Sequence, residues 1–305
     1  MKIKRYYSLN MYFKGICSHR VGKICVDAGF TCPNRDGTIS ERGCLFCDEK
    51  GSAADYIKRN LPVHEQVKVY LKEKSRGDDR YIVYFQPFTN TYEKAAILKD
   101  LYKAVFVNDR IIGISIGTRP DCIDPEKIGI IEDIAENHEV WLEMGLQTSN
   151  NKTLRTINRG HTAEDFKNAM ELTKGTNIKV CAHVIIGLPG EGPEDYRQTA
   201  DFLSSLPVRG VKLHHLYIAK GTQTAELYKK GEIKTMEKEE YIKQAGEFLK
   251  RIRPDIVIHR LMGDCSEERL IAPLWTRENN SVMDGINGFL KKNNSWQGRD
   301  CSSKI

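Results

Sequence analysis

Short runs of apolar and β-branched residues recur along the chain, separated by longer segments whose apolar positions follow a helical period. Short apolar runs bounded by turn residues are typical of buried strands. The pattern predicts strands at Lys23–Gly29, Tyr81–Gln86, Ile111–Gly117, Val140–Gln147, Ile178–Gly187, Val211–Ile218 and Ile256–Leu261. It predicts helices at Val63–Lys74, Tyr92–Val107, Pro125–Asn137, Ala163–Lys174, Pro193–Leu206 and Glu237–Arg251. Alternation of strands and helices indicates βαβ units and a parallel sheet.

Six or seven such units favour an α/β barrel or partial barrel over an open dinucleotide-binding sheet. We expect a partial (β/α)6-type barrel with a seventh strand and a C-terminal helical cap. The expected divisions are a basic N-terminal segment over 1–22, the barrel over 23–262 and a cap or substrate-side extension over 263–305. In barrels of this kind, functional side chains lie at the C-terminal ends of the strands and in the loops that follow them.

Composition and charge narrow the class of protein. The 305 residues carry a formal charge of 47 − 41 = +6, and residues 1–60 hold 11 basic and 6 acidic side chains. A basic first segment fits an anionic partner such as RNA, but it also fits an ordinary solvated surface, which charge alone favours. No run approaches the roughly 18 apolar residues of a membrane span, and the N-terminus lacks an apolar signal region. We therefore expect a cytoplasmic protein without membrane contact, in which the nine cysteines are reduced.

Three cysteines lie in the loop directly after the first predicted strand: Cys32, Cys44 and Cys47. Three thiolates suit a [4Fe–4S] cluster in which one iron stays open for another ligand. A structural zinc site is the alternative, but such a site requires four protein ligands. Candidates for that fourth ligand are Cys17, His19 and Cys25. Unligated thiols remain a third possibility.

The cysteine loop and several further strings together resemble the radical S-adenosylmethionine (SAM) superfamily. The usual cysteine triad there has three residues between its first two cysteines, whereas this chain has eleven, an expansion typical of the elongator-protein-like branch. Within that branch the chain is similar to the YhcC/YtqA group. The strings are Asp27-Ala-Gly-Phe-Thr-Cys-Pro-Asn-Arg-Asp-Gly-Thr38, Tyr84-Phe-Gln-Pro-Phe-Thr-Asn-Thr91, Ile114-Ser-Ile-Gly-Thr-Arg-Pro-Asp121, Glu143-Met-Gly-Leu-Gln147, Ile186-Gly-Leu-Pro-Gly190 and His259-Arg-Leu-Met-Gly-Asp264.

This resemblance implies an oxygen-sensitive enzyme with one [4Fe–4S] cluster on Cys32, Cys44 and Cys47. The open iron would be chelated by SAM. An electron from a flavodoxin- or ferredoxin-type donor would then cleave SAM to a 5′-deoxyadenosyl radical, which abstracts a hydrogen atom from the substrate. The cofactors carry this chemistry, and the protein supplies binding and orientation.

The resemblance also implies which residues contact SAM. Gln147 and Arg159 reproduce the spacing of a SAM-binding pair, with Arg159 suited to the methionine carboxylate. His183 stands where relatives place an aspartate for the ribose, and a buried structural histidine is the alternative. The stretch from Gly187 to Pro189 would let the backbone approach adenine. Residues available in place of the usual Gly-Gly-Glu contact to the SAM amino group are Gln86, Thr89 and Asn90.

Polar residues at the other strand ends are expected to orient the substrate, although a structural role is at least as common for each alone. They are Arg119, Asp121, Glu143, His214, Tyr217 and His259. For the YtqA-like part of the group, the resemblance implies a tRNA substrate. The implied reaction converts 5-carboxymethylaminomethyluridine at the wobble position to 5-aminomethyluridine. The alternatives are a radical SAM enzyme acting on a small molecule or peptide, and a zinc-containing, non-enzymatic RNA-binding protein.

Overall fold

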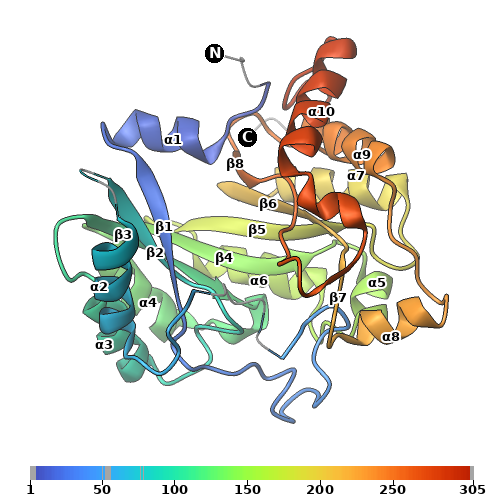
Figure 1. The fold of residues 1–305 in the computed structure, drawn as a ribbon. Helices are drawn as coiled ribbons and strands as arrows, with labels where there is room; N and C mark the ends of the chain where they lie inside the picture. The colour runs from blue at the N-terminus through green and yellow to red at the C-terminus, as the bar shows by residue number, and fades with distance from the viewer. Residues whose placement is uncertain (1–4, 50, 52–55, 76, 78, 303–305) are drawn as a thin grey trace.

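A curled parallel sheet organises the molecule (Figure 1). The computed structural model describes residues 5–49, 51, 56–75, 77 and 79–302. Within these residues the main sheet has seven strands in the order β1-β2-β3-β4-β5-β6-β8, all parallel to their neighbours. Their bounds are β1 Val21–Val26, β2 Arg80–Phe85, β3 Ile111–Thr118, β4 Glu139–Gln147, β5 Lys179–Ile186, β6 Gly210–His215 and β8 Val257–Arg260. The predicted partial α/β barrel is therefore confirmed.

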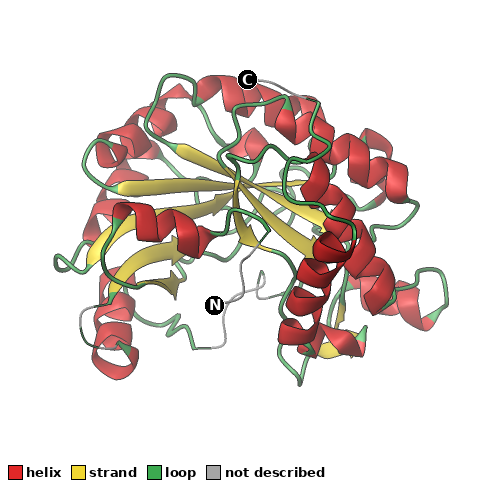
Figure 2. Cartoon of the chain, turned by 90° about the horizontal axis from the view of Figure 1, so that it is seen from above, coloured by secondary structure: helices red, strands yellow, loops and turns green. Residues whose placement is uncertain are grey.

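Helices follow the strands and cover the outer face of the curled sheet, as Figure 2 shows. They are α2 Val63–Lys74, α3 Ala95–Ala104, α4 Pro125–Ala135, α6 Ala163–Leu172, α7 Pro193–Ser204 and α9 Lys238–Arg251. Pro125 and Pro193 each begin a helix, where the missing N–H of proline costs no hydrogen bond. The structure adds four helices that the sequence pattern does not predict individually: α1 Leu9–Ile16, α5 Asn151–Thr156, α8 Gln223–Lys229 and α10 Asn279–Lys292.

Strand β4 illustrates why the outer face is apolar and the inner face is not. Side chains alternate across a strand. Val140, Leu142 and Met144 lie in the core beneath the helices, whereas Glu143 and Gly145 face the barrel interior, where they line a cavity. The outer core is thus built from every second residue of the strands, and the intervening positions are free to carry polar chemistry.

The N-terminal part of the chain partly closes the barrel between β1 and β8. The backbone N–H of Ile258 in β8 donates to the carbonyl of Tyr7, at 2.7 Å. From helix α1, the Tyr12 hydroxyl donates to Glu139 Oε1 at 2.6 Å, and its ring packs edge-on against Trp141. Because Glu139 begins β4, this contact places α1 at the end of the barrel opposite the loops that carry the cysteines.

The C-terminal part deviates from the predicted strand pattern. The sequence predicts one strand over Val211–Ile218, but β6 ends at His215. The chain then forms β7, Ile218–Ala219, which pairs antiparallel with β9, Leu270–Ala272. Helix α10 packs on α9, where Gly246 leaves room for the ring of Phe289, so the C-terminal segment is helical as expected.

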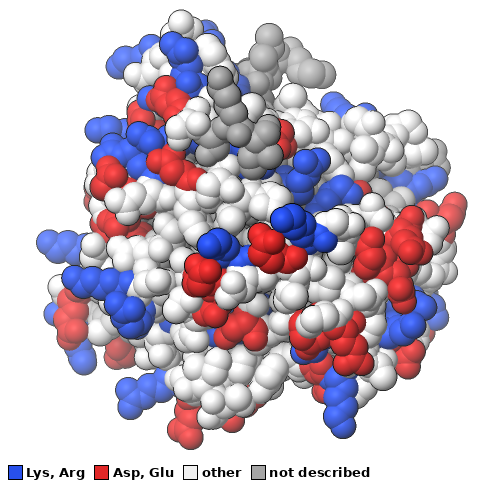
Figure 3. All heavy atoms as spheres, turned by 180° about the vertical axis from the view of Figure 1, so that it is seen from behind, with Lys and Arg blue, Asp and Glu red and all other residues white. Residues whose placement is uncertain are grey.

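The surface charge is dispersed on the face seen in Figure 3, where basic and acidic side chains alternate without a large patch of one sign. In the described residues, no helix combines the length and apolar character required to cross a bilayer.

Candidate active site at the cysteine loop

The loop after β1 folds tightly around its cysteines. The backbone N–H of Arg35 donates to the carbonyl of Cys32 at 2.8 Å, and that of Cys47 donates to the carbonyl of Cys44 at 2.9 Å. Gly43 adopts a φ of +70°, a conformation that favours glycine. Cys32 and Cys44 are buried, while Cys47 is half-buried. All three line one cavity, which we call the cysteine cavity.

Segments distant in sequence fix this loop in place. The N–H of Leu45 donates to the carbonyl of Ile157 at 3.1 Å, and the Asn158 side-chain amide donates to the carbonyl of Gly43 at 2.7 Å. On the other side, the N–H of Thr224 donates to the carbonyl of Leu45 at 3.0 Å. The loop is therefore held between the segment after α5 and the start of α8.

A further link joins the cysteine loop to the C-terminal part of the chain. The Arg269 guanidinium forms an ion pair with Asp48, the residue next to Cys47. Asp48 is buried, so the pair is shielded from solvent. Arg269 directly precedes β9.

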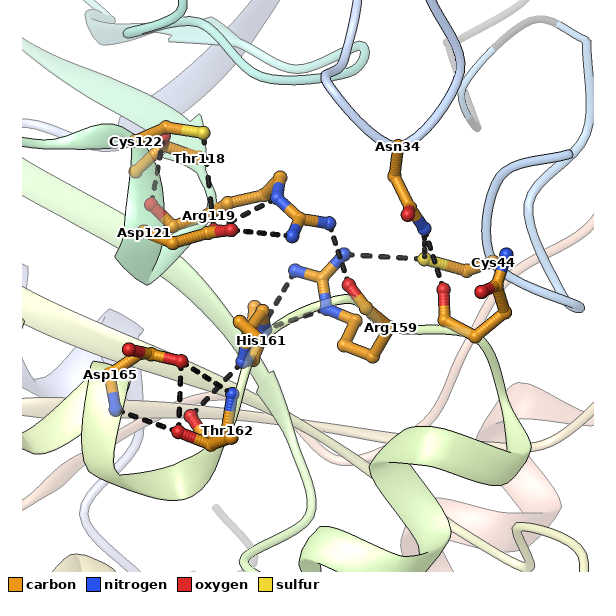
Figure 4. A network of polar contacts seen from close by, with 12 residues as sticks. Asn34, Cys44, Thr118, Arg119, Asp121, Cys122, Arg159, His161, Thr162 and Asp165 are labelled. Atoms are coloured by element: carbon orange, nitrogen blue, oxygen red, sulfur yellow. Dashed lines mark hydrogen bonds and ion pairs between the residues drawn. The ribbon is translucent and has the colours of Figure 1, made fainter. Parts of the chain in front are cut away.

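Hydrogen-bond donors point at two of the cysteine sulfurs. The Asn34 amide and the Arg159 Nη1 each lie 3.4 Å from Cys44 Sγ (Figure 4). Arg35 Nη1 lies 3.8 Å from Cys47 Sγ. Such donors stabilise negative charge on thiolates and tune metal–sulfur centres. Three thiols on one cavity, surrounded by cationic donors, fit an anionic iron–sulfur cluster. Across the residues that the structure describes, no three His, Cys, Asp or Glu side chains converge closely enough for a single metal ion.

Arg159 is held from several sides. Its Nη2 donates to the carbonyl of Gly145 at 2.9 Å, and its own carbonyl accepts from Arg119 Nη1 at 2.8 Å. Arg119 in turn makes a two-point contact with the Asp121 carboxylate, at 2.9 and 2.7 Å. Figure 4 shows this chain of contacts running from Asp121 to Cys44. Arg159 is thus preorganised at the cysteine cavity.

The cysteine cavity has a volume of about 250 Å³ and collects many of the residues singled out in the sequence. Predicted site residues that line it are Cys32, Cys44, Cys47, Gln86, Arg119, Glu143, Gln147, Arg159, His183, His214 and Tyr217. Gln147 lines it with a φ of +74°, an unusual backbone conformation for glutamine that is typical of functional sites.

Other predicted residues lie outside this lining. Asp121, Asn90, Gly187 and Pro189 are not part of it, and His259 lines a neighbouring cavity instead. Asn90 is buried, and its side-chain amide donates to the carbonyls of Phe85, Pro87 and Gly117. Of the three alternatives to the Gly-Gly-Glu contact, Gln86 and Thr89 therefore face the cavity, whereas Asn90 holds the turn.

Below the cysteines, a buried carboxylate binds two lysines and a histidine. Glu143 accepts from Lys23 Nζ at 2.7 Å, from His183 Nε2 at 2.9 Å, and from Lys212. Both ammonium groups also lie over the Tyr84 ring, at 4.6 and 4.2 Å from its centroid.

The charge states in this cluster follow from burial and proximity. Burial alone would raise the pKa of Glu143, but the ammonium groups of Lys212 and Lys23 outweigh it and hold the pKa well below 4.5. Burial, aided by Lys212, lowers the pKa of His183 to about 4, so the neutral ring donates its Nε2–H to Glu143. Burial also lowers the pKa of Lys212 to about 8, against the effect of Glu143. At neutral pH, Glu143 is an anion between two cations.

Lys23, Lys212 and Asn34 are the site residues that the sequence pattern does not single out. A signal for the lysines exists in hindsight. Lys212 lies between the buried apolar residues Val211 and Leu213, and a charged residue at such a position needs a buried partner. The period of two along β6 also places Lys212 on the same face as His214.

Comparison with known sequences identifies the class of protein. The Radical SAM superfamily model matches residues 36–203, and the model of the Radical_SAM C-terminal domain matches residues 208–292. The chain therefore belongs to the radical SAM superfamily, whose enzymes use a [4Fe–4S] cluster and SAM.

Individual relatives place the chain within this superfamily. It is 35% identical to the uncharacterized protein YtqA of Bacillus subtilis over 299 residues, which are 97% of this chain and 92% of YtqA. It is 31% identical to the tRNA uridine(34) acetyltransferase of Methanocaldococcus jannaschii over 140 residues, 44% of this chain and 25% of that protein. The resemblance to the YhcC/YtqA group and to the elongator-protein-like branch is therefore confirmed.

A solved structure shares the fold. The Elp3 protein of Methanocaldococcus infernus, lacking residues 1–46, superimposes with a TM-score of 0.69 at 18% sequence identity. The match covers 92% of this chain and 64% of that chain. This similarity supports the partial barrel and its connectivity.

Proposed function

We propose that this radical SAM enzyme modifies tRNA, converting 5-carboxymethylaminomethyluridine at the wobble position to 5-aminomethyluridine. The observation that carries the proposal is the cysteine cavity, which brings three cysteines together with a polar barrel interior. The partial similarity to a tRNA uridine(34) acetyltransferase favours a tRNA wobble uridine as the substrate. A basic first segment is consistent with an anionic partner.

In this proposal Cys32, Cys44 and Cys47 hold the [4Fe–4S] cluster, and Arg159 and Gln147 hold SAM. When bound, these cofactors would supply a 5′-deoxyadenosyl radical that takes a hydrogen atom from the carboxymethyl carbon next to the nitrogen of the uridine arm. Return of one electron to the cluster, loss of a proton and hydrolysis of the resulting imine would release the carboxymethyl group as glyoxylate and leave the amine. A flavodoxin- or ferredoxin-type protein is the proposed electron donor. The side chains of the barrel interior exclude water and hold the arm in position for the abstraction.

The test is an anaerobic reaction of reconstituted protein with dithionite, SAM and tRNA from cells that accumulate the proposed substrate nucleoside. We expect 5′-deoxyadenosine in excess of a control without tRNA, together with conversion of the wobble nucleoside measured by mass spectrometry. Equal 5′-deoxyadenosine yields and an unchanged nucleoside would remove tRNA as the substrate and favour a small molecule or peptide.

The protein's metal content separates the enzyme from a zinc-containing RNA-binding protein. Anaerobically purified protein should contain iron and acid-labile sulfide, and a Cys44→Ala variant should contain neither. Zinc in place of iron would favour the non-enzymatic alternative.

A further inference from the structure

A second cavity adjoins the cysteine cavity inside the barrel, and we call it the side chamber. Its volume is about 410 Å³. The residues that line both cavities are Tyr84, Gln86, Lys212, Tyr217, Arg260 and Asp264. Because they share these side chains, the two cavities meet, and a group in the side chamber lies within reach of the cysteine cavity.

Cations dominate the walls of the side chamber. Arg269 is paired with Asp48, and Lys23 shares the single charge of Glu143 with Lys212. Arg260 pairs with β6 through its backbone, but its side chain forms no hydrogen bond and no ion pair with any residue in the described ranges. The remaining acidic residue of the lining, Asp264, is solvent-exposed. The chamber thus carries more positive charge than its own carboxylates balance.

The Lys212 ammonium also has N–H donors that make no hydrogen bond to a described residue. An ammonium group has three N–H donors, and among the described residues Lys212 uses one of them, on Glu143. The Lys212 ammonium form predominates at neutral pH, because the pKa is about 8. Nearby, the His214 Nε2 is buried without a hydrogen-bond partner in the described part of the chain. Burial, aided by Arg260, holds the pKa of His214 well below 6.5, so its ring is neutral.

From this arrangement we infer that the side chamber binds a terminal carboxylate of the substrate, held by the Arg260 guanidinium and the Lys212 ammonium. A guanidinium donates two parallel hydrogen bonds to a carboxylate, and one added negative charge balances the excess positive charge of the chamber. A carboxylate at the end of a flexible arm can enter the chamber. A backbone phosphodiester, flanked by a ribose on each side, stays at the surface. The inference rests on the proposed function, because it takes the arm of the modified uridine as the group that enters.

The test measures binding separately from turnover. Two anticodon stem–loop RNAs are compared, one carrying 5-carboxymethylaminomethyluridine at the wobble position and the other its methyl ester. Reconstituted protein with saturating SAM and no reductant binds each RNA anaerobically, and fluorescence anisotropy gives the affinities. We expect the wild-type protein to favour the carboxylate RNA by about tenfold or more, as charged hydrogen bonds allow.

Variants assign the preference to residues. Arg260→Gln should reduce the ratio of affinities to about twofold or less, Arg260→Lys should keep part of it, and Lys212→Met should lower it independently. Arg299→Gln is the matched control, because Arg299 lies over the exposed Trp296 ring, outside the lining of both cavities, and its loss should leave the ratio of affinities unchanged. Unchanged iron content and SAM affinity verify that each variant is folded.

Each outcome decides. A wild-type ratio of affinities near one would overturn the carboxylate site, and so would the absence of binding to either RNA. So would an unchanged ratio in Arg260→Gln and Lys212→Met, which would place the preference on other residues or on SAM. A large ratio that these variants abolish, combined with no conversion of the nucleoside under reducing conditions, would retain the chamber and reject the proposed function. Conversion of the nucleoside combined with a wild-type ratio of affinities near one would retain the proposed function and reject the carboxylate site.

Discussion

At the scale of single residues, Glu143 shows how one buried charge organises its surroundings. Its side chain is fully buried, yet it remains ionised because Lys23 and Lys212 flank it. A buried charge is tolerated where its partners are also in place, and removing one partner leaves the others uncompensated. Glu143 is therefore a counter-ion of the barrel interior.

We expect Glu143→Gln to lower the free energy of unfolding at pH 7 by about 3 kcal/mol, because the buried Lys212 ammonium and the partly buried Lys23 ammonium lose their anion. The loss should be smaller at pH 9, where Lys212, with a pKa of about 8, is largely neutral. Urea unfolding of the anaerobic apoprotein at both pH values measures the effect.

Glu194→Gln on α7 is the matched control, because Glu194 makes an exposed ion pair with Arg197. It should cost under about 1 kcal/mol. A Glu143→Gln cost no larger than that of the control, or one equal at both pH values, would contradict a counter-ion role.

Which side chains line the cysteine cavity was predictable from sequence where those residues belong to distinctive strings. The three cysteines share one cavity, as their common loop suggests. The polar network of the interior was not predictable, because it depends on distances between strands. Glu143 on β4 meets Lys23 on β1 and Lys212 on β6, and these lie 120 and 69 residues away. Only closure of the sheet brings them together.

At the scale of elements, a glycine in β3 sets how closely two strands approach. A Cβ on Gly113 would lie 1.9 Å from the carbonyl oxygen of Glu139 at the start of β4. Backbone cannot move aside as a flexible side chain can. We expect Gly113→Ala to reduce the free energy of unfolding by about 2 kcal/mol or more, as overpacking does.

Gly129→Ala provides the comparison for this prediction. Gly129 is exposed within α4, and a Cβ there meets no atom within 4 Å. Alanine should stabilise the protein by about 0.5–1 kcal/mol through helix propensity. Urea midpoints that move in the same direction for both variants would disprove the packing argument.

Elements with strong local signals were predicted well, and those that depend on tertiary packing were not. The bounds of α2 agree with its prediction at both ends. Helix α10 contains three asparagines and two glycines, so its local helical preference is weak. Its buried face of Val282, Ile286 and Leu290 packs toward α9, and that contact stabilises the helix. Similarly, the strand predicted over Val211–Ile218 is divided in the structure. Its first part is β6, which ends at His215, and its last residue belongs to β7, which pairs with β9 instead of the main sheet.

At the scale of the whole molecule, several histidines are buried in the neutral form. Burial lowers the pKa of His161 and of His215 to about 3, and that of His183 to about 4. In the unfolded chain each has a pKa near 6.5, so below that pH the unfolded state binds protons that the folded state does not. Stability is therefore lost as the pH falls from 6.5 toward these folded-state pKa values.

We expect each of these histidines to cost about 1 kcal/mol of unfolding free energy between pH 6.5 and 5.5. His215→Phe isolates one contribution, since the ring packs against Trp275 and Tyr241 and phenylalanine preserves that packing. The variant should lose about 1 kcal/mol less than wild type over the same interval in urea unfolding. Parallel pH curves for the two proteins would exclude the protonation linkage at His215.

The ion pair between Asp48 and Arg269 joins residues 221 positions apart. One partner belongs to the superfamily match over 36–203, and the other to the C-terminal match over 208–292. The two matched regions are therefore in direct contact beside the cysteine loop. During synthesis the loop bearing Cys47 leaves the ribosome long before Arg269, so the ion pair beside the cysteine cavity forms only when nearly the whole polypeptide has emerged.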